Sequence, residues 1–124
     1  MTKYIPRDKI LGASDVSVAE LEVPEWGGTI LVRELTTAEV ENFSLRTQDR
    51  SGQLNTARMA GLRAEIVTWC VVDEDGNQVF EKGDEKALQL KSHRVIDRVF
   101  NKTMELSGLK DNVVPEGEAD EKKE

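Results

Sequence analysis

The sequence of 124 residues has too few histidines and cysteines to build the catalytic and metal sites that depend on these side chains. It contains one cysteine, Cys70, and one histidine, His93, which excludes an internal disulfide and a Cys/His zinc site. His93 lies between a serine and an arginine where a helix is expected to begin, so a solvated side chain is expected there. Cys70 follows Trp69 in an apolar stretch, where a small buried side chain is expected. The sequence therefore predicts a protein that is not an enzyme and needs no cofactor or metal.

Basic residues are outnumbered, with 17 lysines and arginines against 24 acidic residues and a net charge of −7. Nucleic acids and anionic membranes are bound by basic faces, so neither is an expected partner. No apolar run approaches the ~20 residues that span a bilayer. Residues 1–12 carry several charges and lack the apolar segment of a signal peptide. These features predict a cytoplasmic protein.

Two short motifs that could suggest ligand binding do not meet the requirements of the sites they resemble. In the acidic run DEDGN at 73–77, a calcium loop with Gly76 in its sixth position would begin at Val71, whose side chain has no oxygen. The Trp-Gly-Gly sequence at 26–28 is not followed directly by a helix and lacks the lysine of a phosphate-binding loop. The first motif is predicted to be a turn, across which Val71-Val72 and Val79-Phe80 are expected to pair briefly. The second is predicted to be the tip of a hairpin.

The hairpin is predicted by two alternating segments, VAELEV at 18–23 and TILVREL at 29–35. Pro24 lacks an amide proton and marks the end of the first strand. Gly27 and Gly28 are expected to supply the positive φ angles of a tight turn.

A turn at Trp26 and Gly27 also predicts the register of the two strands. It places Val23 opposite Ile30, and it places Glu20 opposite Arg33 as a pair of opposite charges. A slip of one residue would move the apolar side chains of one strand to the other face, which disfavours that register.

The rest of the sequence predicts three to four helices. TTAE at 36–39 is a capping box, in which Thr36 accepts from the amide of Glu39 while the glutamate reaches back. A second helix is expected after Asn55, because apolar residues then recur at spacings of three and four. These residues are Met59, Leu62, Ile66 and Trp69.

A short helix is expected from Gly83 and Asp84. A last helix is expected to be capped by Ser92, with Gly108 just after its end. Residues 110–124 contain six acidic residues and three lysines without an aromatic residue, and this composition predicts disorder.

The fold class is therefore α+β, mainly α, with an N-terminal β-hairpin and a disordered acidic C-terminal tail. Residues 1–17 are expected to be weakly ordered, with one helical turn at 7–11. A single globular domain is expected over 18–109, followed by the tail at 110–124.

Three stretches together resemble a known family. They are VPEWGGTILVREL at 23–35, LRAEIVTWCVVDEDGNQVF at 62–80 and ELSGL at 105–109. This combination is similar to the tail assembly chaperones of long-tailed bacteriophages, the XkdN-like and lambda G-like group, over about residues 8–109. The hairpin motif is the most specific part of the resemblance.

The resemblance implies a non-enzymatic chaperone in the host bacterial cytoplasm that binds and solubilises the tape measure protein and is absent from the finished virion. It also implies that a −1 ribosomal frameshift can produce a longer form that recruits tail tube protein. The sequence EKKE at 121–124 is compatible with a slippery codon run. The tape measure protein, the client of such a chaperone, is long. A small acidic domain would cover it most simply if several copies also associate with one another.

Candidate partner-binding residues all lie on the hairpin motif: Trp26, Gly27, Gly28, Arg33 and Leu35. Trp26 has two interpretations, a lid over the protein's own helices or an anchor for another chain. The alternative function is a structural tail-completion or head–tail connector protein of the virion. A third, an acidic inhibitor that mimics DNA, is disfavoured by the lysines and arginines scattered among the acids.

Overall fold

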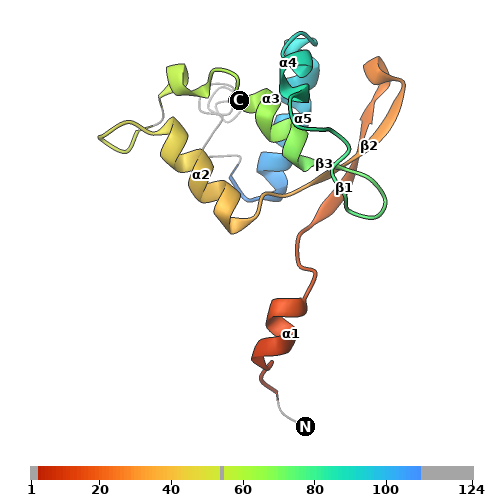
Figure 1. Ribbon diagram of the computed structural model, residues 1–124, viewed down its shortest axis with the longest axis vertical. Helices are drawn as coiled ribbons and strands as arrows, with labels where there is room; N and C mark the ends of the chain where they lie inside the picture. Colours follow the sequence, from red (N-terminus) through yellow and green to blue (C-terminus); the bar gives the residue numbers. More distant parts are fainter. Residues whose placement is uncertain (1–2, 54, 110–124) are drawn as a thin grey trace, which may run out of the picture.

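The computed structural model describes residues 3–53 and 55–109, which form five α-helices, two 3-10 helices and one three-stranded sheet (Figure 1). In chain order the elements are α1 (Arg7–Gly12), β1 (Val18–Val23), η1 (Pro24–Trp26), β2 (Gly28–Arg33), α2 (Thr37–Thr47), η2 (Thr56–Met59), α3 (Leu62–Cys70), β3 (Val71–Val72), α4 (Asp84–Leu88) and α5 (His93–Leu106). This confirms the predicted α+β, mainly helical class. The predicted disorder of the tail concerns residues outside the described ones.

The hairpin forms where it was predicted, but its predicted register is wrong by two residues. Val23 pairs with Gly28 instead of Ile30, and Arg33 pairs with Val18 instead of Glu20. A slip of two residues leaves every side chain on its own face, so the alternating pattern fits both registers equally well. The inner face therefore stays apolar, and Val23 is completely buried.

The turn accounts for the difference in register. η1 replaces the expected two-residue turn, and the amide of Gly27 closes it by donating to the carbonyl of Pro24 at 2.9 Å. Gly27 has a φ of 89°, which favours glycine, whereas Gly28 is an ordinary strand residue without positive φ. The expectation that both glycines adopt positive φ is therefore wrong for Gly28.

The pairing of β3 with β2 was not predicted, and it makes β2 the central strand of the sheet. β3 pairs only with Leu31 and Val32 of β2. The expected turn follows it, with the Asp73 carboxylate accepting from the amides of Asp75 and Asn77 at 2.9 and 3.0 Å. The chain then returns beside β3, confirming the brief pairing expected across this turn.

The capping box at the start of α2 is confirmed in both directions. Thr36 Oγ1 accepts from the Glu39 amide at 3.3 Å, and Glu39 Oε1 accepts from the Thr36 amide at 2.9 Å. The second predicted helix is divided into η2 and α3, because Gly61 between them adopts a φ of 76°. Asn55 caps the first part, accepting from the Ala57 amide at 2.9 Å.

The core lies where α5 packs on α3 and against the inner face of β1 and β2. Its largest completely or almost completely buried side chains are Phe100, Leu62, Ile66 and Met104. Ser92 occupies the N-cap position of α5 without a side-chain hydrogen bond, so the expected side-chain cap is not formed. The C-terminal end follows the prediction, since the amides beyond it, on Gly108 and Leu109, bond back to the last turn.

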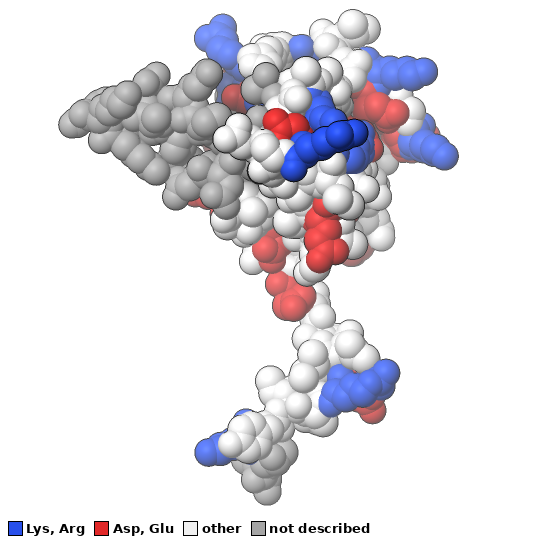
Figure 2. Space-filling view, turned by 90° about the vertical axis from the view of Figure 1, so that its left-hand side faces the viewer, with Lys and Arg blue, Asp and Glu red and all other residues white. Residues whose placement is uncertain are grey.

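The α1 segment stands apart from the rest of the chain (Figures 1 and 2). The helical turn expected there is present, but none of its residues is buried. Residues 13–17 lead from it to β1 without regular structure. The N-terminal segment is therefore an arm that projects from the body of the molecule.

Candidate partner-binding surface

The base of the hairpin is held by a two-point ion pair. Arg33 donates from both terminal nitrogens to the two carboxylate oxygens of Glu39, each at 2.9 Å, and also to the carbonyl of Glu34 at 2.8 Å. Burial alone would raise the pKa of the Glu39 carboxyl, but the hydrogen bonds from Arg33 and Thr36 together lower it. The same carboxylate thus completes the capping box and fixes the end of β2.

Leu35 lies next to this pair and is 5% exposed. Its amide donates to the hydroxyl of Ser107 at 2.8 Å, and that hydroxyl donates to the carbonyl of Thr103 at 2.8 Å. Of the hairpin residues predicted as candidates, Arg33 and Leu35 are therefore engaged in contacts within the chain that join β2 to α2 and α5.

The tip of the hairpin is held by a second two-point pair. Arg98 of α5 donates to both carboxylate oxygens of Glu25 at 2.8 Å. The hydrogen bond from Arg98 lowers the pKa of Glu25 to about 2. Trp26, the next residue, is half-buried and packs against the core. These contacts support the interpretation of Trp26 as a lid.

The same tryptophan also lines an open groove of about 660 Å³ beside the central strand. The groove lies where β3 ends, because β3 pairs with only two residues of β2. Its apolar lining comes from the hairpin and from the loop that follows β3, and includes Trp26, Ile30, Leu31, Val79 and Phe80. Val79 is 52% exposed, so the apolar surface is open to solvent.

Every charged side chain that lines this groove is acidic. They are Glu20, Asp73, Glu74 and Asp75. Among residues 3–53 and 55–109, none of the four forms an ion pair. An apolar floor with an unneutralised acidic rim favours a partner that is apolar and basic together.

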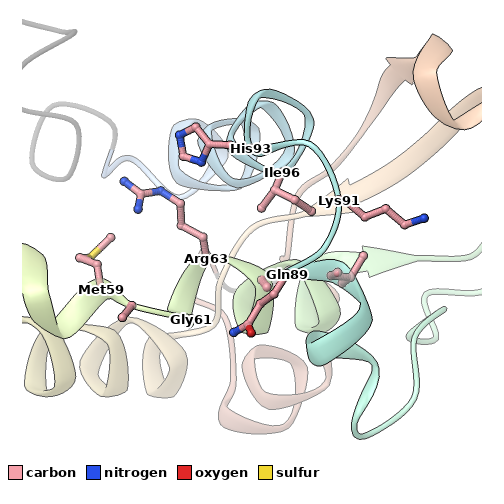
Figure 3. A pocket seen from close by; sticks show the side chains of 10 residues that line it. Met59, Gly61, Arg63, Gln89, Lys91, His93 and Ile96 are labelled. Carbon is pink, nitrogen blue, oxygen red and sulfur yellow. The ribbon is translucent and has the colours of Figure 1, made fainter.

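A second hollow, of about 280 Å³, lies between α3, α4 and α5 (Figure 3). Arg63 and His93 border it on one side, while Lys91 points away from it. The Arg63 guanidinium is already used, since its Nε donates to Asp97 at 3.1 Å and its centre lies 5.1 Å from the Phe100 ring. This hollow therefore brings together no set of free charges.

The described residues contain neither a reactive thiol nor a cluster of metal ligands. Cys70 is buried, and burial raises the pKa of its thiol to about 12, so the thiol is protonated at neutral pH. In the part of the chain that the structure describes, no three His, Cys, Asp or Glu side chains are grouped as metal ligands. None of the described helices is long and apolar enough to cross a membrane.

The sequence predicted the hairpin half of the groove but not the other half. Trp26 lines the groove, while Gly27 forms the adjacent turn and Gly28 pairs within the sheet. Val79 and Phe80 were expected only as a brief strand after a turn, and their return to the hairpin depends on β3 pairing with β2. The apolar pair that follows the acidic turn after one residue, Gln78, was the available signal.

This combination defines a small α+β domain with an open apolar groove. The comparisons with known proteins agree with that class. The model of the phage tail assembly chaperone family matches residues 13–124. The structure resembles that of the bacteriophage HK97 tail assembly chaperone, with a TM-score of 0.57 and 17% identity, covering 80% of this chain and 90% of that one. The comparison with curated protein sequences gave no match.

The family match extends over nearly the whole chain, and the fold match covers most of both proteins. The chain therefore belongs to the phage tail assembly chaperone family.

Proposed function

We propose that this protein binds the tape measure protein of its phage and keeps it soluble until the tail tube forms around it. The family match over residues 13–124 carries the proposal. A tape measure helix with exposed apolar stripes would aggregate unless another protein covers those stripes reversibly. This role requires no catalysis, and it places the protein in the host cytoplasm rather than in the virion.

The groove is the surface that best suits such a client. Its floor offers Trp26 and Phe80 to an apolar side chain, and its acidic rim favours neighbouring lysines or arginines. The net charge of −7 keeps a complex with an apolar, basic segment soluble. The groove therefore selects basic amphipathic segments of the client.

The experiment is co-expression of this chain with the tape measure protein encoded in the same genome. The soluble fraction of the tape measure protein should rise with the wild-type chain and fall back with Val79→Lys, which places a positive charge in the groove. Leu45→Lys is the matched control, because Leu45 is 78% exposed on α2 and lies outside the groove. If the soluble fraction of the tape measure protein is the same with both variants, the client binds a surface other than the groove. If the wild-type chain does not raise that fraction, the proposed chaperone function is wrong.

We also propose that a longer product, made by a −1 frameshift at the codons for residues 121–124, joins this complex to tail tube protein. The lysine pair in EKKE supports this because it permits a slippery codon run. Mass spectrometry of the protein purified from infected cells should show a second, longer species. A single species ending at Glu124 would contradict it.

A further inference from the structure

The strand β2 has a stretch of free edge beside the groove. β3 pairs only with Leu31 and Val32, so in the described chain no strand lies on that side of residues 28–30. The chain leaves the sheet at the end of β3, where the Asp73 amide donates to the Asn77 carbonyl at 2.8 Å. The hairpin therefore extends beyond β3 (Figure 1), and the groove of about 660 Å³ lies along the edge that this leaves open.

Thr29 is the residue of this edge whose backbone groups face the groove. The Glu34 amide donates to the Ser17 carbonyl at 2.9 Å, which continues the hydrogen-bonded ladder between β1 and β2. Such pairs recur at every second residue, so the backbone groups of Gly28 and Ile30 face β1 and those of Thr29 face away from it. With no strand of the described chain opposite them, the Thr29 amide and carbonyl are a donor and an acceptor for another chain.

Gly28 leaves room for a neighbour at this edge. Its φ is not positive, and a Cβ atom at this position would meet nothing within 4 Å. Neither the backbone conformation nor packing within the described chain therefore requires a glycine here. A glycine inside a strand is typical of a place that a ligand or another backbone approaches closely. The space beside Gly28 can take a side chain of an added strand.

The two faces of the sheet predict the side chains that such a strand needs. Side chains of a strand alternate between the faces. Those beside Ile30 lie on the core side, where Phe80 also packs. The side chain beside Thr29 lies on the opposite face, which carries Glu20 and Glu22 of β1. An added strand therefore suits the edge when apolar and basic residues alternate along it.

We propose that the client binds by adding a short extended segment, with alternating apolar and basic residues, to the free edge of β2. The backbone of the segment donates to the Thr29 carbonyl and accepts from the Thr29 amide, and its apolar side chains fill the space beside Gly28 and Ile30. A helical segment uses its own backbone groups internally and would leave those of Thr29 unpaired. A single pair of backbone hydrogen bonds makes a weak contact that a chaperone can release.

Charge selects the client over the acidic end of the same chain. Residues 110–124 contain six acidic residues and three lysines, and the charged side chains that line the groove are all acidic. Like charges disfavour that segment at this edge, whereas a basic segment neutralises the rim. This inference rests on the proposed function, because it takes the client to be the partner.

The test is solvent-exchange NMR of the isotopically labelled full chain with the peptide Arg-Ile-Arg-Ile-Arg, blocked at both ends. The Thr29 amide should exchange about tenfold more slowly when free peptide is at about ten times its Kd, because the bound peptide accepts its proton. The amides of Gly28 and Ile30, which face β1, should change little. Absence of binding would overturn the proposal, as would binding that leaves Thr29 exchange unchanged. Slower exchange at Thr29 in the protein alone, as its concentration rises, would also overturn it and assign the edge to a second copy.

Two altered peptides separate strand addition from attraction between charges. Methylation of the backbone nitrogen of the central arginine removes the donor to the Thr29 carbonyl and should abolish binding. The peptide Ile-Ile-Arg-Arg-Arg has the same composition and charge without the alternation, and it should bind more weakly. If both altered peptides bind as tightly as the first, the contact is not an added strand.

A change in the protein tests the space at the edge. Gly28→Val should weaken peptide binding about tenfold, because the new side chain fills the space that the peptide needs. Gly12→Val is the matched control, since Gly12 also lacks a positive φ and has nothing within 4 Å of its Cβ position, but lies in α1. Unfolding temperatures close to that of the wild type show that both variants fold. Equal affinity of the two variants for the peptide would contradict the role of Gly28.

The failure of this inference and the failure of the proposed function give different results. If co-expression solubilises the tape measure protein but the peptide does not protect Thr29, the chaperone function stands and the added strand is wrong. If the peptide protects Thr29 but the tape measure protein stays insoluble, the edge binds extended peptides and the proposed client is wrong.

Discussion

The two ends of the hairpin are fastened by the same kind of ion pair in different surroundings. At the base, the side chains of Arg33 and Glu39 are 16% and 23% exposed. At the tip, those of Arg98 and Glu25 are 37% and 48% exposed. Both pairs are two-point contacts of 2.8–2.9 Å, so their geometry is nearly the same and they differ in their exposure to solvent.

The difference shows which end of the hairpin can move. An exposed pair contributes little, because water and salt screen its charges, whereas a half-buried pair leaves a costly unpaired charge when it breaks. The base is also tied through the capping box and through the hydrogen bond from Leu35 to Ser107. The tip, which carries Trp26 and borders the groove, is therefore the end able to adjust to a partner.

The largest effect is expected from the core between the two ends, which sets the scale for the other variants. Ile66→Ala should lower the free energy of unfolding by about 2–5 kcal/mol, because Ile66 is completely buried and its removal leaves a cavity. Urea unfolding followed by circular dichroism measures this loss. A loss below about 0.5 kcal/mol would show that α3 does not pack as described.

The next largest effect is expected at the base. Arg33→Met should cost about 2 kcal/mol, less than for a fully buried pair, because it leaves the Glu39 carboxylate unpaired in half-buried surroundings. Arg46→Met is the control, since the pair between Arg46 and Glu65 is more exposed, and it should cost about 0.5 kcal/mol. If the two variants lose the same free energy of unfolding, burial does not make the Arg33–Glu39 pair more important to stability than the exposed pair.

At the tip, Trp26→Ala separates the lid from the anchor. The half-buried ring should contribute about 1–2 kcal/mol to stability through its contact with the core. Trp69→Ala is a matched control, because Trp69 is also half-buried against the core but lies outside the groove. Loss of stability together with client binding supports the lid, and loss of client binding alone supports the anchor. If neither changes, Trp26 has neither role.

The smallest effect is expected from the exposed pair at the tip. Because the pKa of Glu25 is lowered to about 2, the pair stabilises the fold above the ordinary glutamate pKa of about 4.5. This contribution is lost as the pH falls from about 4.5 towards 2. Glu25→Gln should therefore remove a small part of the acid dependence of thermal stability and leave stability near pH 7 almost unchanged. A large loss at pH 7 would show that the tip is as firmly held as the base.

Features that depend on neighbouring residues could be predicted from the sequence. The capping box requires only Thr36 and Glu39 three residues apart, and the turn after β3 requires only Asp73 and the amides that follow it. In both cases the side chain and its backbone partner lie within one turn of chain, so the local sequence determines the contact.

Features that depend on long-range pairing could not be predicted. The hairpin register differs because a 3-10 turn closes the loop, and alternation does not distinguish two registers that differ by two residues. β3 is two residues long, which is too short for any periodic pattern, yet it makes β2 central and brings Phe80 to Trp26. The candidate site combines both cases, because Trp26 and the acidic run at 73–77 are evident in the sequence, whereas their meeting at one groove is evident only in the fold.

The position of α5 has a consequence for synthesis on the ribosome. α5 is the last described element of the chain, and it supplies Val99, Phe100 and Met104, all completely buried. Until it has been translated, the inner face of the sheet and α3 have no cover, and the hydrogen bond that joins Leu35 to Ser107, 72 residues apart, cannot form. Folding of this domain is therefore completed only after α5 has been translated, and a product that terminates before α5 exposes the core to proteases.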